Sequence, residues 1–491
     1  EAARLDDVLE PTGKNPLWFG RVEDGRTTIW AQFKDVDPNM EEVEVNVRRA
    51  VFYPEDPGMN YISVRGFTME QAATSWAPPT AEQVGLIGTH WSRGWIIENN
   101  TIRYSVCSGI TLGKYGDEFD NKSSNSAEGY VATIKRALKN GWSKANIGHH
   151  LVRNNHISHC EQAGIVGSMG AAFSTITGNE IHDIHMRRLF SGMEMGGIKI
   201  HGAIDTLISH NHVYRCWRGL WLDWMAQGAR VTGNLLHDNE TTQDLFMEVN
   251  HGPFLVDHNF FLSGNGLNDI SQGGAYAHNL FAGRIIAWSN TRITPYHKAH
   301  STEIAGMDTF PGGDSRFYNN IFLSQEKPVP WPERIPEKLN NQSYFGLATY
   351  DSAGLPVYMS GNVFLGKAEP PSHEEAPLVM SHFHPGITVE EESDGWYIKM
   401  KFQEKWTEHQ RPLVTSELLG KAIIPDLPFE DPEGKPYLLD EDYFGNPRNA
   451  TNPYPGPLHA RKPGEQFIRI WPKNLLSEAL TRTSWTGIFK L

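Results

Sequence analysis

Two acidic residues, Asp223 and Glu248, end two short apolar runs of similar form. The runs are Gly-Leu-Trp-Leu-Asp at 219–223 and Asp-Leu-Phe-Met-Glu at 244–248. On adjacent parallel strands in register, which lie about 4.8 Å apart, the two carboxyl groups would stand on the order of 5 Å apart. Retaining glycosidases need roughly 5–5.5 Å between nucleophile and acid/base, and inverting ones about 6.5–9.5 Å. One carboxyl of such a pair should have a raised pKa, as a general acid requires.

Other runs of this form place further side chains beside the pair. The second and fourth positions are mostly aliphatic and should face the core, so the third and fifth should point outward. The fifth positions read Gly113, Ser168, His201, Asp223, Glu248 and Gln272, and the third read Thr111, Val166, Lys199, Trp221 and Phe246. Trp221 and Phe246 offer flat surfaces for a sugar ring, and Lys199 and His201 offer donors to hydroxyl groups. Gln272 completes the predicted binding set.

Three other functional interpretations remain open at this point. Solvated Asp and Glu are common on such faces without any chemical role. A polysaccharide lyase would need a carboxylate cluster for Ca²⁺ and a basic residue over an anionic sugar, and Lys199 is the one basic residue in the aligned positions. A non-catalytic glycan-binding protein would explain the aromatic residues but not the paired acids.

A repeated Asn-x-apolar phrase predicts the fold that positions these runs. Its tightest intervals are 24, 23, 25 and 20 residues, a period typical of stacked supersecondary units. The segments between are short β-branched and aromatic runs broken by Asn and Gly. We therefore predict an all-β solenoid, a right-handed parallel β-helix, in which each Asn adopts a left-handed turn and bonds to the next. The repeated asparagines are Asn100, Asn155, Asn179, Asn211, Asn234, Asn259, Asn279, Asn320 and Asn362.

The rest of the chain divides around these coils. Residues 1–60 form a β-rich segment with strands expected at 27–33 and 43–47, each with one buried face. The catalytic β-helix should span 61–365, with insertions at 114–150, 187–196 and 285–315. The first insertion should hold a helix at 127–140, capped by Ser126 and ended by Gly141. Residues 366–491 are proline-rich and lose the period, so we expect an irregular, extended tail that packs on the helix.

Composition narrows the partners and the compartment. The net charge of −14 argues against nucleic acid and strongly anionic glycans, and no apolar run is long enough to span a bilayer. Three cysteines, Cys107, Cys160 and Cys216, form an odd, sparse set that favours the cytoplasm. No signal peptide is visible, although the chain begins at Glu1.

Two loops carry metal-binding residue types but incomplete patterns. His297 and His300 have the spacing of metal ligands but no Cys partner, and residues 117–121 lack full EF-hand spacing. We expect no metal and no cofactor.

Four stretches resemble glycoside hydrolase family 120, whose members are retaining β-xylosidases on a parallel β-helix with a β-sandwich. They are residues 141–149, 191–199, 219–228 and 244–253. The resemblance covers about residues 15–370. It implies Asp223 as nucleophile, Glu248 as acid/base and Glu194 near the bound sugar, with short β-1,4-xylo-oligosaccharides as substrates. The alignment of runs finds the carboxylate pair but does not assign the two roles.

One departure from the family concerns the start of the chain. Family members carry a longer portion before the region that matches Glu1, which contributes coils, much of the sandwich and an aromatic residue at the sugar site. A homo-oligomer or a separate N-terminal chain is therefore an open expectation. The sugar itself, xylose or arabinofuranose, also stays open.

Overall fold

The computed structural model describes residues 2–472 apart from short internal segments. The segments left out are 11, 14, 121, 123–125, 191–193, 240–241, 325–345, 373 and 376. Part of the predicted insertion at 187–196 and the end of the predicted tail, 473–491, therefore lie outside the described residues.

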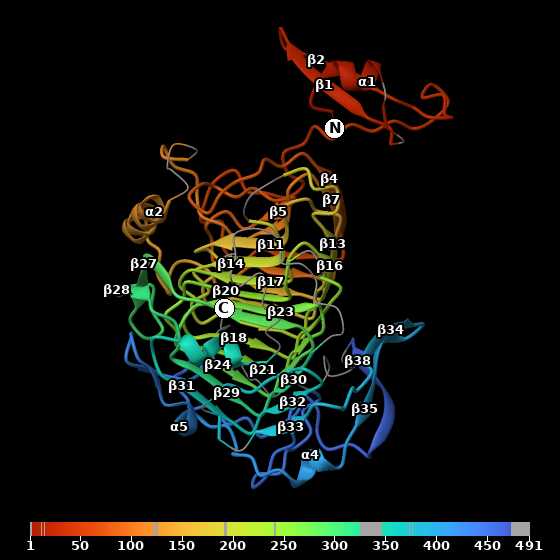
Figure 1. The fold of residues 1–491 in the computed structure, drawn as a ribbon. Coiled ribbons are helices and arrows are strands. Elements are labelled where there is room, and N and C mark those ends of the chain that lie inside the picture. The colour runs from red at the N-terminus through yellow and green to blue at the C-terminus, as the bar shows by residue number, and fades with distance from the viewer. Residues whose placement is uncertain are drawn as a thin grey trace.

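The predicted right-handed parallel β-helix is confirmed, and its described strands form three parallel sheets (Figure 1). Sheet 1 holds β5 (Ile87–Gly88), β8 (Ser108–Thr111), β11 (Ala163–Ser168), β14 (Gly196–His201), β17 (Leu220–Asp223), β20 (Leu245–Glu248), β23 (Asn265–Ile270) and β26 (Arg284–Ala287). Sheet 2 holds β3 (Ser63–Arg65), β6 (Ile96–Glu98), β9 (Leu151–Arg153), β12 (Thr175–Thr177), β15 (Leu207–Ser209), β18 (Ala229–Thr232), β21 (Phe254–Asp257), β24 (Gly274–Ala277), β29 (Ser315–Tyr318) and β31 (Val357–Ser360). Sheet 3 holds β4 (Thr68–Ala72), β7 (Thr101–Ser105), β10 (His156–Ser158), β13 (Glu180–Ile184), β16 (His212–Cys216), β19 (Leu235–His237), β22 (Phe260–Phe261), β25 (Leu280–Phe281), β30 (Ile321–Leu323), β32 (Val363–Leu365) and β33 (Leu378–Met380).

The repeated asparagines form a buried ladder at the corner between sheets 2 and 3. Each Nδ2 donates to the Oδ1 of the next asparagine at 2.9–3.0 Å, from Asn100 to Asn362, and Asn362 donates to Glu374. Each Oδ1 also accepts the backbone N–H of the preceding ladder residue, as Asn234 does from Asn211 at 2.9 Å. The amide side chains thus satisfy backbone groups that the turn would otherwise bury unpaired.

The left-handed position lies one residue before each asparagine, which corrects the expectation that the asparagine itself adopts it. Asn99, Gly178, His210 and His258 have φ values of 56°, 65°, 56° and 58°. Asn, Gly and His tolerate this conformation better than branched residues do. One residue therefore turns the chain, and the asparagine that follows it bonds to the next coil.

The core inside the sheets is aliphatic and aromatic. Phe261, Phe281, Phe322 and Phe364 stack from coil to coil with ring centroids 4.9, 5.5 and 5.3 Å apart. The three cysteines are free and buried. No described helix is long and apolar enough to cross a membrane.

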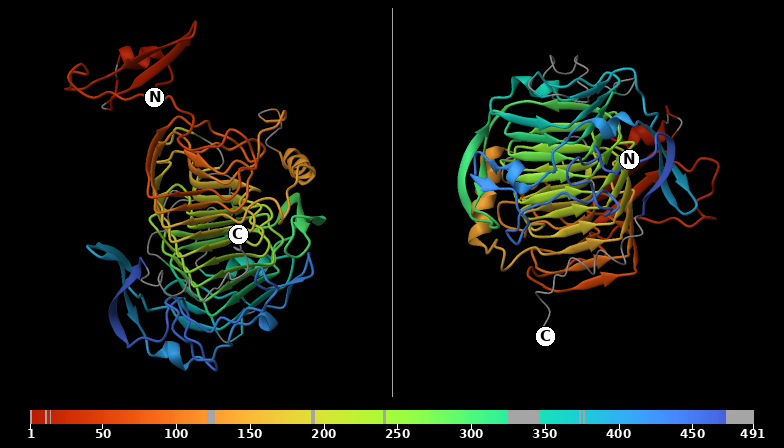
Figure 2. Two further views of the ribbon diagram at one scale, coloured as in Figure 1. Left: turned by 180° about the vertical axis from the view of Figure 1, so that it is seen from behind. Right: turned by 90° about the horizontal axis from the view of Figure 1, so that it is seen from below.

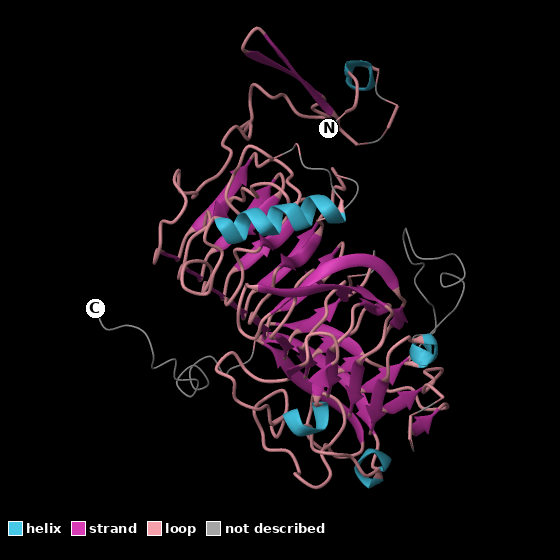
Figure 3. Ribbon diagram, turned by 90° about the vertical axis from the view of Figure 1, so that its left-hand side faces the viewer, coloured by secondary structure: helices cyan, strands magenta, loops and turns pink. Residues whose placement is uncertain are grey.

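Two insertions lie on the same side of the solenoid, beside sheet 1 (Figures 1 and 3). The first carries α2 (Ala127–Lys139), which begins as predicted, because Ser126 Oγ accepts the N–H of Gly129 at 3.1 Å. The second is an antiparallel hairpin, β27 (Asn290–His297) and β28 (Ile304–Phe310).

The N-terminal segment departs in part from expectation. It holds α1 (Leu5–Leu9) and an antiparallel hairpin of β1 (Trp18–Glu23) and β2 (Arg26–Ala31), so the first expected strand is present but starts and ends earlier. The expected buried face is absent from it, since none of its side chains is buried. Residues 43–47 form no strand, and Val43, Val45 and Val47 are exposed. Alternation of apolar residues there does not reflect a buried face in the described chain.

The tail packs along the solenoid but is more regular than expected (Figure 2). Strands β34 (Thr388–Glu392), β35 (Gly395–Phe402) and β38 (Gly464–Trp471) form an antiparallel sheet whose apolar face packs on sheet 3. Further elements are η1 (Ala348–Ser352), α4 (Lys405–Glu408), α5 (Ser416–Leu419), β36 (Lys421–Ala422) and β37 (Leu427–Pro428). The pairing of β35 with β38 joins segments far apart in sequence and carries no local period. The hairpin of β34 and β35, which turns at Asp394 and Gly395, is local and has a sequence signal of its own.

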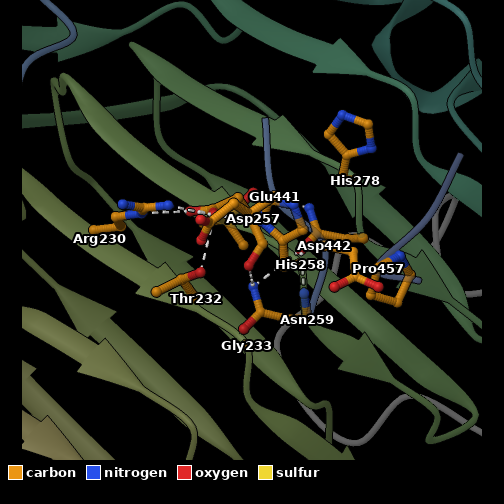
Figure 4. Close-up of polar contacts among 12 residues, drawn as sticks. Arg230, Thr232, Gly233, Asp257, His258, Asn259, His278, Glu441, Asp442 and Pro457 are labelled. Carbon is orange, nitrogen blue, oxygen red and sulfur yellow. Dashed lines mark hydrogen bonds and ion pairs between the residues drawn. The ribbon is translucent and has the colours of Figure 1, made fainter. Parts of the chain in front are cut away.

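A polar cluster lies where the tail meets sheet 2 (Figure 4). Asp257 accepts two hydrogen bonds from Arg230 and one from Thr232, each at 2.8 Å, and one from His258 Nδ1 at 2.7 Å. Burial raises the pKa of Asp257, but Arg230 and His258 outweigh it and hold the pKa below its usual range. The cluster neutralises its own charge and has a structural role.

The ladder makes a testable claim about stability. Asn211→Leu should lower the free energy of unfolding by about 1–3 kcal/mol, because the donors of Asn179 lose their acceptor in a buried turn. Denaturant unfolding measures the change. The exposed loop residue Asn146 provides the control, and Asn146→Leu should change stability by less than about 0.5 kcal/mol. Equal effects of the two substitutions would refute a structural role for the ladder.

Candidate active site

Three neighbouring strands of sheet 1 bring the predicted residues together. His201 pairs with Asp223 between β14 and β17, and Asp223 pairs with Glu248 between β17 and β20. Two residues earlier on each strand, Lys199 pairs with Trp221, and Trp221 pairs with Phe246. The observed register matches the predicted alignment on these strands.

The alignment is wrong at the next strand. Glu248 pairs with Ile270, and Phe246 with Asn268, so Gln272 lies two residues beyond the predicted position. Its Nε2 contacts His251 Nδ1 at 2.9 Å and donates to the carbonyl of Thr309 at 3.0 Å, which supports the hairpin instead. Starting the run at Gly266, the position that Gly219 holds in its own run, would have given the correct register.

A buried lysine links two carboxylates at the centre of the site. Lys199 Nζ lies 2.5 Å from Glu194 Oε1 and 3.1 Å from Asp223 Oδ2. His201 Nε2 lies 3.1 Å from Asp223 Oδ2 and also contacts Lys199 Nζ, and all four side chains are buried. Glu194 reaches the cluster from a left-handed backbone position with φ of 73°.

The same cluster contains the one potential metal-ligand group found among the described residues, Glu194, His201 and Asp223. Their ligand atoms lie within 4.8 Å of one another. Because Lys199 already contacts both carboxylates, its ammonium group supplies the positive charge that a metal ion would bring. Protonated lysine has no lone pair to offer a metal, so the residues suit an ion-pair network better than a metal centre.

The paired carboxyl groups have opposite pKa shifts. Burial disfavours the charged form of Asp223, but His201 and Lys199 outweigh burial and lower its pKa. Burial and then the negative charge of Asp223 raise the pKa of Glu248, against a smaller opposing effect of Arg292. Asp223 is therefore ionised, while Glu248 retains its proton to higher pH than an ordinary glutamate.

Arg292 is a site residue that the sequence did not reveal. It lies in β27, and its Nη1 donates to Glu248 Oε1. The hairpin is an insertion between coils, so the periodic alignment contains no position for it. Arg218 is a second such residue. Its guanidinium lies 4.1 Å from the ring centroid of Trp221 and 5.1 Å from that of Phe246.

Trp221 and Phe246 are not the exposed platform that the alignment suggested. Their rings stack with centroids 5.2 Å apart, and Trp221 is only 1% exposed. Lys199 Nζ lies 4.3 Å from the Trp221 ring centroid and is a second cation, besides Arg218, against that ring. The aromatic pair therefore packs against cations and walls the site.

Several buried polar atoms of the site have no hydrogen-bond partner in the described part of the chain. They are Glu194 Oε2, His201 Nδ1, Trp221 Nε1 and Asp223 Oδ1. A buried polar atom left unpaired costs about 1–3 kcal/mol. Such atoms gathered in one place fit a ligand rich in hydroxyl groups, which both donate and accept.

The two insertions enclose this part of sheet 1. Tyr130 of α2 donates to or accepts from Ser168 Oγ at 3.2 Å, and its ring lies edge-on to His201 at 4.8 Å. Phe310 of β28 stacks on His251 at 4.4 Å. Enclosure lowers the local polarity and strengthens the charge interactions described above.

The two weaker metal candidates have other partners. His300 Nδ1 lies 3.0 Å from both oxygens of Asp205, and its Nε2 lies 3.1 Å from Glu430 of the tail. His297 Nδ1 donates to the carbonyl of Thr302. In the acidic loop, Lys114 Nζ pairs with Asp120 at 2.9 Å, and Asn121 lies outside the described residues.

A comparison with known protein families agrees with the parallel β-helix described above. A family model described as a right-handed β-helix region matches residues 85–291. No curated protein matched the chain. The chain is thus a right-handed β-helix protein with a buried paired-carboxylate site.

A solved structure makes the relationship more specific. The complex of XylC with xylose is 40% identical, with a TM-score of 0.85, and the match covers 93% of this chain and 74% of that one. The chain belongs to the β-helix family that includes XylC.

The lysine at the centre of the site can be tested without any substrate. Lys199→Met should lower the free energy of unfolding by about 3–5 kcal/mol at pH 7, because two buried carboxylates lose their counter-ion. Lys298, 64% exposed on the hairpin and paired with Glu303, is the control, and Lys298→Met should cost at most about 1 kcal/mol.

The effect should also depend on pH. The pKa values of Glu194 and Asp223 are lowered in the folded state, after burial is offset by Lys199 and His201. Their pairing therefore stabilises the fold above the unfolded pKa values of about 4 and is lost as the pH falls below them. In Lys199→Met burial is no longer offset by the lysine, so the two carboxyls take up protons at higher pH than in the wild type. The difference in stability should therefore shrink from pH 7 to pH 4, and a constant difference would contradict the ion-pair account.

Proposed function

We propose that this protein is a retaining β-xylosidase of the family 120 type, which releases xylose from short β-1,4-xylo-oligosaccharides. The observation that carries the proposal is the adjacent pair Asp223 and Glu248, with opposite pKa shifts, in a chain 40% identical to a protein solved with xylose. The strand spacing of about 4.8 Å supports retention rather than inversion, which needs a wider gap for water.

In the first step, Asp223 acts as the nucleophile. His201 and Lys199 hold Oδ2, which leaves Oδ1 without a partner among the described residues and available to attack the anomeric carbon. The bond from that carbon to the leaving oxygen breaks, and Glu248 transfers its proton to the departing oxygen. The products are a xylosyl ester on Asp223 and an ionised Glu248.

In the second step, Glu248 acts as the base. Esterification removes the charge of Asp223, which was one cause of the raised pKa of Glu248. Arg292 and Lys199 still favour the ionised form, so the carboxylate can take a proton from water. The hydroxide attacks the anomeric carbon, releases xylose and restores Asp223.

Sugar hydroxyls would bind the unpaired polar atoms. Glu194 Oε2 accepts, while His201 Nδ1 and Trp221 Nε1 can donate. Burial and the charge of Lys199 lower the pKa of His201, but Asp223 and Glu194 outweigh them and raise it.

The stereochemistry of the product tests the mechanism. Hydrolysis of nitrophenyl β-xyloside, followed by proton NMR in the first minutes, should show β-xylose before mutarotation. First formation of α-xylose would rule out double displacement at this pair.

Substitutions separate the two roles. Glu248→Ala should lose about 10²–10⁴-fold on xylobiose, whose leaving oxygen needs a proton, but much less in the first step on dinitrophenyl xyloside. Azide needs no base, so it should restore turnover and give β-xylosyl azide. Asp223→Ala should be nearly inactive on both substrates, because no leaving group replaces the nucleophile.

The reverse pattern would exchange the roles. Activity of Asp223→Ala on dinitrophenyl xyloside, with β-xylosyl azide as product, would assign the acid/base role to Asp223. Inactivity of the wild-type protein on every aryl glycoside tried would instead favour a glycan-binding protein.

A further inference from the structure

We propose that Arg292 of the inserted hairpin is the positioning residue of the acid/base, which holds the Glu248 carboxyl on the side where the leaving group departs. This inference rests on the proposed function. It assigns a reaction role to an element outside the repeating coils.

The contact itself is direct and lies at the edge of the site. Arg292 Nη1 donates to Glu248 Oε1. The Arg292 side chain is 40% exposed, whereas that of Glu248 is 6% exposed. Arg292 therefore lies between the buried acid and the solvent.

The hairpin fixes Arg292 relative to Glu248. Thr294, two residues further along β27, donates from Oγ1 to the carbonyl of Val249, the residue after Glu248, at 3.1 Å. The same hydroxyl lies 3.1 Å from His251 Nε2. The N–H of Arg292 donates to Asn290 Oδ1 at 2.9 Å. These bonds tie the hairpin to the strand end that carries the acid.

The other charged groups that face Glu248 are engaged elsewhere. Asp223 of β17 repels it, and Lys199 of β14 is bound to Glu194 and Asp223. Arg218, just before β17, stacks on the Trp221 and Phe246 rings. Among the described residues, Arg292 alone makes a hydrogen bond to the Glu248 carboxyl.

This arrangement assigns one oxygen to each task. Arg292 holds Oε1 and leaves Oε2 to carry the proton that is transferred to the leaving oxygen. In the second step the same contact stabilises the carboxylate while it takes a proton from water. Arg292 touches Glu248 and acts through it, so its loss should change how Glu248 ionises as well as the rate.

The test compares Arg292→Met, Arg292→Lys and the control Lys298→Met by the pH dependence of kcat/KM on xylobiose. Glu248 must be protonated in the free enzyme, so activity falls as it ionises at high pH. Arg292 lowers the pKa of Glu248, so its removal should move the alkaline limb of the kcat/KM profile to higher pH by about one unit or more. Arg292→Lys should restore most of the wild-type limb, and Lys298→Met should leave it in place.

The choice of substrate adds a second readout. Arg292→Met should lower kcat on xylobiose by about tenfold, as expected for loss of part of the general-acid contribution. Its first step on dinitrophenyl xyloside should change by less than about threefold, because that leaving group needs no proton. An unchanged alkaline limb in Arg292→Met, or an equal shift in Lys298→Met, would overturn the assignment.

A titration without substrate separates this proposal from the proposed function. Carbon-13 NMR of protein labelled at the glutamate side-chain carboxyl follows Glu248, whose signal is identified by its absence in Glu248→Gln. The midpoint should rise in Arg292→Met and not in Lys298→Met. If the wild-type protein hydrolyses no xyloside but the midpoint rises, the pairing stands and the proposed function fails; if the midpoint does not move, the role of Arg292 is wrong.

Discussion

The hydrogen bond between successive ladder asparagines is the interaction on which the other features depend. Each amide group satisfies a buried backbone N–H in the preceding coil and donates to the next amide at 2.9–3.0 Å. The repeated bond fixes, at one corner, which residues of successive coils lie side by side, and with it the register of all three sheets. The register matters because a slip of one residue would turn every apolar side chain outward. The side-by-side placement of Asp223 and Glu248 follows from that register, although both lie in a different sheet from the ladder turn.

The site stabilises buried charged side chains by placing groups of opposite charge in contact. Buried carboxylates and a buried lysine are each unfavourable alone, and the cluster of Glu194, Lys199, His201 and Asp223 compensates their charges. Glu248 stands outside this compensation and is contacted by an arginine at the solvent edge. Two carboxyl groups on neighbouring strands thus have opposite pKa shifts. His201 and Lys199 outweigh burial at Asp223, whereas burial and the charge of Asp223 outweigh Arg292 at Glu248.

The features predicted from the sequence are those with a local pattern, and the features missed are those without one. The coils, the helix start at Ser126 and the register of β14, β17 and β20 follow from local periodicity and capping. The register failed at Gln272, where a short coil allowed two alignments. The contact of Arg292 with Glu248 and the pairing of β35 with β38 join segments far apart in sequence, for which a single chain carries no local pattern. Trp221 is covered by Lys199 and Phe246 of the neighbouring strands and by Arg218 just before its own strand, which the alternation within the run does not reveal.

The hairpin that carries Arg292 interrupts the ladder in sequence but not in space. Asn279 bonds to Asn320 at 3.0 Å across 41 residues, while Asn259 bonds to Asn279 at 2.9 Å across 20. The distance between coils is therefore independent of the length of chain that joins them. An inserted loop could be lengthened or shortened without changing the spacing of the strands that carry Asp223 and Glu248, so the walls of the site can vary, by evolution or by design, while the coils stay the same.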